Sequence, residues 1–245
     1  NTVFQQSLAV YEELAKPFNA DDISMVPHAP YSVSKDLFKM LDEVNSEGST
    51  VSIHNQEVAA EDQLFRYSNG RFIDFYEFMN LKTESIPLTG MSSLHYALSN
   101  MNPAMNTLLV HNTMCEAEDI EAALNWSLNI YWVTCPNANL YIENKLPDYR
   151  MMLSKEVKMC IGSDSLSSNG QLSIFEEMKT IKKYQSTIND LDLIRWATVN
   201  GAEALGYNDL GRIEKGLAPG LNLIEVEVND GIFDLRKAKC NTKIV

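Results

Sequence analysis

The chain alternates short apolar runs with longer stretches in which apolar residues recur every three or four positions. The first pattern is typical of buried strands and the second of amphipathic helices. Strands are predicted at residues 23–27, 50–54, 107–111, 129–134 and 157–163. Helices are predicted at residues 4–18, 34–44, 58–65, 117–126, 149–153, 173–181, 191–196 and 202–205. This alternation indicates an α/β fold with a parallel sheet.

The strand–helix units are too few to close a barrel. Five can be counted in the sequence, whereas a TIM (β/α)₈ barrel has eight in about 250 residues. We therefore expect residues 1–208 to form part of such a barrel, with the missing units upstream of Asn1. After Gly211 the helical periodicity is lost, and strands at 221–228 and 232–235 are joined by a turn at 229–231. Residues 209–245 are expected to supply the C-terminal strands of a small β-sandwich.

Composition narrows the range of partners. The 245 residues include 33 acidic and 20 basic side chains and carry a net charge of −13, which argues against nucleic acid. The sequence has no apolar run of the roughly 20 residues that cross a bilayer and no signal-peptide pattern, so we expect no membrane association. The four cysteines form no C-x-x-C pair. Buried, reduced thiols are the expected state, which suits a cytoplasmic protein.

Chemically active side chains collect at the carboxyl ends of the predicted strands. His54 and His111 end two strands, and Asp164 follows another. In parallel barrels this edge carries the active site. Glu57 lies three residues after His54, where it could ligate a metal or move protons. Each residue also has a structural interpretation: a hydrogen-bonded strand-end histidine, a helix cap, or a first-turn carboxylate facing the helix dipole.

Three further features have a structural and a functional interpretation. His95 fits a helix start or a buried hydrogen bond, and alternatively a substrate contact from the long connection at 66–106. Four aromatic residues could pack together or stack a purine-like ring, with packing favoured by their helical spacing: Phe72, Phe75, Tyr76 and Phe78. The acidic residues between 116 and 121 are expected to form a solvated helix start rather than a metal site.

Eight short motifs occur in an order that is far more specific than any one of them. They are PHAPYSVS (27–34), SIHNQE (52–57), VHN (110–112), CPNANL (135–140), IGSDS (161–165), SN (168–169), ATVNGA (197–202) and LGRIEKG (210–216). Together they resemble the amidohydrolase superfamily, in the branch of methylthioadenosine/S-adenosylhomocysteine deaminases and related chlorohydrolases. The resemblance runs from about residue 23 to 228 and implies a barrel of the metal-dependent hydrolase type.

The resemblance also implies a division of labour. His54 and Asp164 would be ligands of one divalent metal, Zn²⁺ or Fe²⁺, and Asp164 would also take a proton from the attacking water. Glu57 would protonate the ring nitrogen of the substrate, and His111 would orient or polarise the water and the reacting carbon. His28 and Asn139 would contact a small-molecule substrate. The implied reaction is hydrolytic deamination, or dechlorination, of an aminated heterocycle, and a homodimer is compatible with the family.

This sequence departs from the family pattern at three places. The paired H-x-H ligands of the first barrel strand are absent, so two metal ligands are expected upstream. Thr134 stands where many relatives have His, and Ser163 replaces a Thr before Asp164. The run at 23–27 has no lysine for a carbamylated bridge, which favours a single metal. Two hypotheses stay open: a metal-dependent deaminase, or a catalytically incomplete member that acts as a binding protein.

Overall fold

The computed structural model describes residues 2–18, 22–81, 88–229 and 232–243. The chain forms two compact units, each with its own secondary structure and buried side chains. The first unit consists of Asn1–Trp132 together with Pro147–Val157. The second consists of Val133–Leu146 together with Lys158–Val245. Among the residues that the structure describes, every helix is too short or too polar to cross a lipid bilayer.

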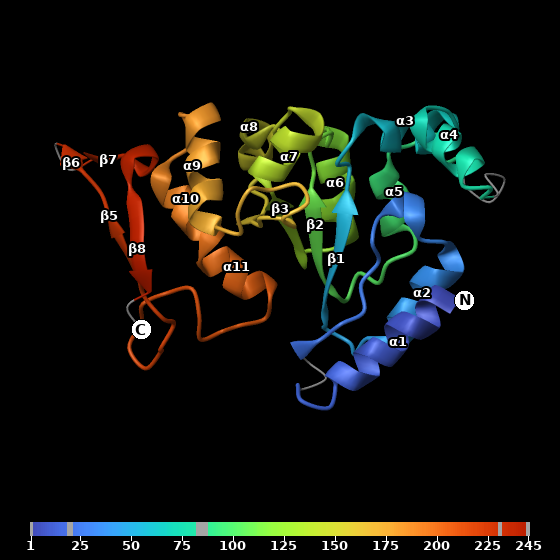
Figure 1. Cartoon of the computed structure of the whole chain (residues 1–245), viewed down its shortest axis with the longest axis horizontal. Helices are drawn as coiled ribbons and strands as arrows, with labels where there is room; N and C mark the ends of the chain where they lie inside the picture. Colours follow the sequence, from blue (N-terminus) through green and yellow to red (C-terminus); the bar gives the residue numbers. More distant parts are fainter. Residues whose placement is uncertain (1, 19–21, 82–87, 230–231, 244–245) are drawn as a thin grey trace. The chain divides into compact units, whose positions relative to one another are not determined.

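The first unit surrounds two parallel strands with helices (Figure 1). Its elements are α1 (Thr2–Leu14), η2 (Pro30–Ser32), α2 (Lys35–Val44), β1 (Thr50–Asn55), α3 (Ala59–Tyr67), α4 (Arg71–Phe78), α5 (Ser93–Leu98), β2 (Asn106–His111), α6 (Ala117–Trp126), the start of β3 (Ile130–Thr134) and α8 (Tyr149–Ser154). The helices predicted at 34–44 and 117–126 are confirmed as α2 and α6. α2 begins after Ser34, whose hydroxyl oxygen accepts a hydrogen bond from the Leu37 backbone N–H.

The register of β1 and β2 brings their carboxyl ends together. The two strands pair in parallel from Thr50 beside Asn106 to Asn55 beside His111. Along both strands alternate side chains are buried, as expected for the two-residue period of a strand. Ile53 and Leu109 thus lie in the core, where Leu64, Phe65 and Trp132 are also fully buried. The sheet continues to β3, because Thr107 donates its backbone N–H to the Asn129 carbonyl.

The second unit combines the end of β3 with a short strand, helices and two small antiparallel pairs. Its elements are α7 (Pro136–Glu143), β4 (Met159–Ile161), α9 (Ile174–Tyr184), α10 (Asp190–Ala197), α11 (Val199–Ala204), β5 (Asn222–Glu225), β6 (Val228–Asn229), β7 (Ile232–Phe233), η4 (Leu235–Lys237) and β8 (Lys239–Lys243). The Gly162 backbone N–H donates to the Thr134 carbonyl, which joins the end of β4 to β3. β5 pairs with β8 and β6 with β7 (Figure 1).

The strand predicted at 23–27 is wrong. The segment is extended but forms no strand. Met25 donates its backbone N–H to the Asn45 side-chain oxygen at 2.9 Å and accepts from the Asn45 amide at 2.8 Å. A side chain thus takes both hydrogen bonds that a neighbouring strand would otherwise make, so the apolar pattern alone misidentified the segment.

The C-terminal tail is confirmed in part as β-structure. The strand predicted at 232–235 ends at Phe233, because Asp234 accepts from the Arg236 backbone N–H and starts the 3₁₀ turn η4. The turn predicted at 229–231 includes residues 230 and 231, which lie outside the described residues. β8 was not predicted. The domain boundary at residue 208, the partial (β/α)₈ barrel and the β-sandwich remain predictions.

Candidate active site

The ends of β1 and β2 leave their strands through left-handed backbone conformations. Gln56 has a φ of 46°, His111 a φ of 77° and Asn112 a φ of 57°. Such conformations in residues other than glycine cost roughly 1–3 kcal/mol each and persist only where the surroundings enforce them. They re-aim the chain at the point where the predicted catalytic residues stand.

A pair of buried asparagines holds the two strand ends together. The Asn112 backbone N–H donates to the Asn55 carbonyl at 2.9 Å, and the Asn55 amide donates to the Asn112 side-chain oxygen at 3.0 Å. The Asn112 amide also donates to the Leu109 carbonyl at 2.7 Å. Both side chains are buried. These bonds fix the backbone on either side of His111, which explains how its left-handed conformation is maintained.

Three of the four histidines lie together in the first unit. The rings of His28 and His54 meet edge to face, with centroids 5.0 Å apart. The rings of His54 and His111 are stacked, with centroids 5.3 Å apart. The sequence predicted this association for His54 and His111 from their positions at successive strand ends. His28 joins them from the loop before η2.

The tautomer of His54 follows from its hydrogen bond. Its Nδ1 lies 2.9 Å from the His28 carbonyl oxygen, which can only accept. Nδ1 therefore carries the proton, and Nε2 keeps its lone pair. A histidine oriented through one ring nitrogen by a backbone carbonyl is the usual arrangement of a metal ligand. The arrangement suits His54 to this role.

His28 is held as a neutral ring. The Ser32 hydroxyl donates to the Ala29 carbonyl at 3.1 Å, so its oxygen accepts from His28 Nδ1 at 2.9 Å. Burial, followed by the neighbouring His54, lowers the pKa of His28, while the Glu57 carboxylate acts in the opposite direction. Its Nε2 can therefore accept a hydrogen bond from a ligand.

Glu57 and His111 lie side by side. Glu57 Oε1 is 3.4 Å from His111 Nε2, and the His111 side chain is almost fully buried. The loop that carries Glu57 rests on the buried carboxylate of Glu61, which accepts from the Glu57 backbone N–H at 2.8 Å. Sequence reasoning missed Glu61. Its signal was a carboxylate in the first turn of the helix that follows the loop of Glu57.

In the second unit, Asp164 follows β4 and also has a left-handed backbone, with a φ of 57°. Its carboxylate accepts from the Ser165 backbone N–H at 2.7 Å and from the Ser168 hydroxyl at 2.6 Å. The loop is tied to α9 through Asn169, whose amide donates to the Ser163 carbonyl and to Glu177. The pKa of Glu177 is raised overall, because the effect of burial exceeds the opposing effect of the hydrogen bonds from Asn137 and Asn169.

The donor types fit a divalent metal. In the first unit, Glu57 offers carboxylate oxygens and His111 a ring nitrogen, and in the second unit Asp164 offers carboxylate oxygens. The sequence had assigned the ligand role to His54 and Asp164 and given Glu57 and His111 catalytic roles. All four side chains offer donors of the kind that Zn²⁺ takes. The choice of ligands among them stays a prediction.

The remaining predicted features have different outcomes. His95 donates through Nδ1 to Ser92 Oγ at 3.0 Å, because the Ser92 hydroxyl proton goes to Asp119. His95 is thus held by a hydrogen bond near the start of α5, which is the structural one of its two predicted interpretations. The prediction that the acidic residues at 116–121 are all solvated is wrong for Asp119. It is buried and accepts from the Gln56 amide and the Glu116 backbone N–H. Asn139 is buried in α7, and its substrate role stays a prediction.

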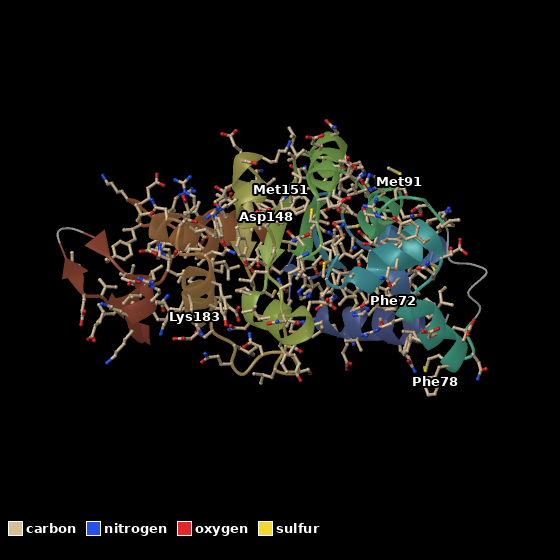
Figure 2. All side chains as sticks on the ribbon, turned by 90° about the horizontal axis from the view of Figure 1, so that it is seen from above. Phe72, Phe78, Met91, Asp148, Met151 and Lys183 are labelled. Carbon is tan, nitrogen blue, oxygen red and sulfur yellow. The ribbon has the colours of Figure 1, made fainter. Side chains whose placement is uncertain are left out.

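The aromatic residues of α4 divide into an inner and an outer set. Phe72 stacks on Tyr31, with centroids 4.3 Å apart, and Tyr76 donates its hydroxyl to the Tyr31 carbonyl. Tyr31 in turn meets His28 edge to face, with centroids 5.9 Å apart. Phe78 is 81% exposed and projects outward in Figure 2, where Phe72 lies deeper. Packing therefore accounts for Phe72 and Tyr76, and places an aromatic stack beside His28.

A groove of about 630 Å³ lies elsewhere in the first unit. It runs between α1, the segment at 23–28 and α2, and most of its lining is apolar. His28 and Ser32 reach it, but His54, Glu57 and His111 do not line it. Among the predicted site residues of the first unit, His28 therefore lines the groove, whereas His54, Glu57 and His111 lie outside it.

Comparison with known proteins identifies the family. The family model described as "Amidohydrolase family" matches residues 1–245. An aminodeoxyfutalosine deaminase from a Nitratiruptor species is 30% identical over 205 residues, which are 81% of this chain and 48% of that protein. A 5-methylthioadenosine/S-adenosylhomocysteine deaminase from Saccharophagus degradans is 28% identical over 206 residues, covering 80% of this chain and 41% of that protein. The chain thus spans about half the length of these relatives.

Solved structures agree on the fold. Helicobacter pylori aminofutalosine deaminase in complex with methylthio-coformycin has a TM-score of 0.70 at 24% identity, over 85% of this chain and 51% of that one. A variant of atrazine chlorohydrolase from Arthrobacter aurescens, complexed with zinc and atraton, has a TM-score of 0.67 at 16% identity, over 90% and 47%. Both predicted branches of relatives, deaminases and chlorohydrolases, are confirmed. The chain belongs to the amidohydrolase family.

Proposed function

We propose that this chain is part of a metal-dependent hydrolase that deaminates an aminated heterocycle, namely an adenine nucleoside or a similar compound. The observation that carries the proposal is the group at the ends of β1 and β2: two histidines stacked at 5.3 Å, with Glu57 3.4 Å from His111. Deaminases among the relatives support the substrate class. Because the chain spans half of those relatives, the activity is proposed for the full-length protein.

The proposed metal site uses His54 and Asp164, with one Zn²⁺ or Fe²⁺. His54 supports this role because its Nδ1–H is engaged by the His28 carbonyl and its Nε2 keeps a lone pair. When bound, such an ion acts as a Lewis acid and lowers the pKa of water. Catalytic sites of this kind use three or more protein ligands. We propose that two further ligands come from sequence outside these 245 residues.

The proton transfers are assigned to this chain's carboxylates. Water adds its oxygen to the ring carbon that bears the amino group, and Asp164 accepts the proton that the water loses. Glu57 gives its proton to the adjacent ring nitrogen. The carbon–nitrogen bond to the amino group then breaks as the nitrogen receives the proton from Asp164 and leaves as ammonia. The hydroxyl group on the ring carbon becomes the carbonyl of the product and returns its proton to Glu57, so both carboxyl groups regain their starting states. His111 is proposed to orient the attacking water, and His28 and Asn139 to contact the substrate.

The alternative is a catalytically incomplete family member that binds a ligand without converting it. It is favoured by the absence of an H-x-H pair from these 245 residues. A cytoplasmic location is proposed for either function, because Cys115 and Cys160 are buried thiols that form no disulfide.

Ammonia release is the direct test. The full-length protein is assayed on adenosine, 5-methylthioadenosine, S-adenosylhomocysteine and aminodeoxyfutalosine, with atrazine and chloride release as the dechlorination arm. Metal content is measured on the same samples. We expect deamination of at least one nucleoside and about one metal ion per chain. Binding of these compounds with release of neither ammonia nor chloride would favour the binding-protein alternative.

A further inference from the structure

A single buried carboxylate lies beneath the loop that joins β1 to α3. Glu61 is in the first turn of α3, which follows directly after the end of β1 in Figure 1, and its side chain is fully buried. Its Oε1 accepts from the backbone N–H groups of Glu57 at 2.8 Å and Val58 at 3.4 Å. Its Oε2 accepts from the Gln56 backbone N–H at 3.1 Å. Three consecutive peptide groups are thus bound by one side chain.

The same carboxylate also ties the loop to α5. The Ser93 hydroxyl donates to Glu61 Oε2 at 3.1 Å. The next residue of α3, Asp62, accepts from the Ser93 backbone N–H at 3.1 Å. Glu61 and Asp62 therefore both hold α5 against α3. Of these two residues, only Glu61 accepts hydrogen bonds from the backbone N–H groups of residues 56–58. This difference makes Asp62 a matched control.

The loop needs such an anchor because of its conformation. Gln56 has a left-handed backbone, a conformation that glycine adopts without strain but glutamine does not. The Gln56 side chain is fixed separately, since its amide donates to Asp119 Oδ2 at 2.9 Å. Glu57, the next residue, directs its carboxyl toward His111 Nε2. The peptide groups on either side of Glu57 are both bound by Glu61, and they set the position of the Glu57 carboxyl.

We propose that Glu61 is a positioning residue for Glu57: it holds the peptide groups of residues 56–58 so that the Glu57 carboxyl meets the substrate in one fixed place. The catalytic part of this proposal rests on the proposed deaminase function. Both oxygens are needed, because donors approach Oε1 and Oε2 separately. Glutamine would keep one acceptor and place an NH₂ group against a backbone N–H. Serving both sides therefore requires two oxygen atoms, which glutamate has and glutamine lacks.

The test compares Glu61→Gln with Asp62→Asn and Ser93→Ala in the full-length protein. In Glu61→Gln, we expect amide hydrogen exchange to lose protection at residues 56–58. We expect kcat to fall by about 10²-fold, the effect of misplacing a catalytic group by about 1 Å, with little change in KM. Asp62→Asn removes the neighbouring charge and Ser93→Ala removes a contact to α5, and both should leave kcat within about threefold and residues 56–58 protected.

Rates are normalised to folded protein, so a purely structural role of Glu61 would lower yield or stability and leave the kcat of the folded fraction unchanged. That result would overturn the proposal. Unchanged exchange at 56–58 in Glu61→Gln would overturn it as well, whatever the rate. If the unsubstituted protein releases no ammonia, the proposed function fails and the catalytic part of this proposal fails with it. Hydrogen exchange then decides separately whether Glu61 fixes the loop.

Discussion

Two loops, one in each unit, are held by a buried glutamate from the helix that follows them. Glu61 binds the loop of Glu57 directly through three backbone N–H groups. Glu177 acts on the loop of Asp164 through a side chain, because the Asn169 amide bridges Glu177 and the Ser163 carbonyl. Both glutamates lie in the first turns of their helices. A buried glutamate can therefore hold a loop directly, through the backbone N–H groups, or indirectly, through a second side chain that acts as a relay.

The largest expected effects on activity come from substituting Glu57 and Asp164, the carboxylates carried by the two loops. Glu57→Gln should lower the rate of ammonia release by about 10²–10⁴-fold, because glutamine cannot transfer a proton. Metal content should stay near that of the unsubstituted protein. Asp164→Asn should lower both the rate and the metal content, since it removes a ligand and a base together.

Activity and elemental analysis on the same samples distinguish the two variants. Glu118→Gln, which changes an exposed carboxylate in the first turn of α6, is the control. Near-normal turnover in Glu57→Gln would contradict the deaminase mechanism and favour the binding-protein alternative.

The second effect is on stability, and it separates direct from relayed anchoring. Glu61→Ala leaves three backbone donors, one buried and two part-buried, without their acceptor and should cost about 3 kcal/mol, at 1–3 kcal/mol per unsatisfied buried group. Glu177→Ala should cost less, about 1–3 kcal/mol, because two of its donors are the Asn137 and Asn169 amides, which can rotate. Denaturant unfolding of the full-length variants measures both values. Equal losses would mean that the relay is as firm as the direct contact.

A third prediction concerns pH. Burial raises the pKa of Glu61 to about 8 from its ordinary value of 4.5, while the backbone hydrogen bonds of Glu57 and Val58 act to lower it. The folded state therefore binds more protons than the unfolded state between these two values. The stabilisation that this gives is complete below about pH 4.5 and is lost as the pH rises through about 8, by at most about 1.4 kcal/mol per pH unit.

The free energy of unfolding should thus fall with pH more steeply in the unsubstituted protein than in Glu61→Gln, which has no titratable group at this position. Urea titrations from about pH 5 to 9, a range that brackets the raised pKa, test the difference. Parallel curves for the two proteins would show that Glu61 does not change its protonation state in this range.

The smallest effect separates the two helix starts. α9 has an ordinary cap, since Ser173 accepts from the Glu176 backbone N–H at 3.3 Å. The corresponding residue of α3 is Val58, which has no polar side chain, so Glu61 replaces the cap. Ser173→Ala should cost about 1 kcal/mol without lowering the rate of ammonia release. A change in activity beyond the change in folded protein would show that the cap also positions the Asp164 loop.

The sequence singled out residues at the strand ends but not the side chains that support them. Strand-end histidines are recognisable because an apolar run stops at a polar residue, and the order of the motifs identified the family. Burial of carboxylates could not be predicted this way. An acidic first turn looks the same whether it faces water or the core, and for Asp119 the outcome depends on Gln56 and Ser92, which are distant in sequence.

The failed strand at 23–27 has a related cause. Its apolar pattern is that of a strand, but the side chain of Asn45 takes the hydrogen bonds of Met25. Local periodicity carries no information about a partner twenty residues away. The two units, similarly, are defined by contacts between distant segments, which the alternation of strands and helices does not report.

The hydrogen bond from His54 Nδ1 to the His28 carbonyl has a consequence for how such a protein can diversify. The acceptor belongs to the main chain, so it survives any exchange of the residue 28 side chain that leaves the backbone in place. Mutation at this position can therefore change the proposed substrate contact without disturbing the ring that is proposed as a metal ligand. The proposed roles of His28 and His54 can thus change independently in evolution, although their rings lie in contact.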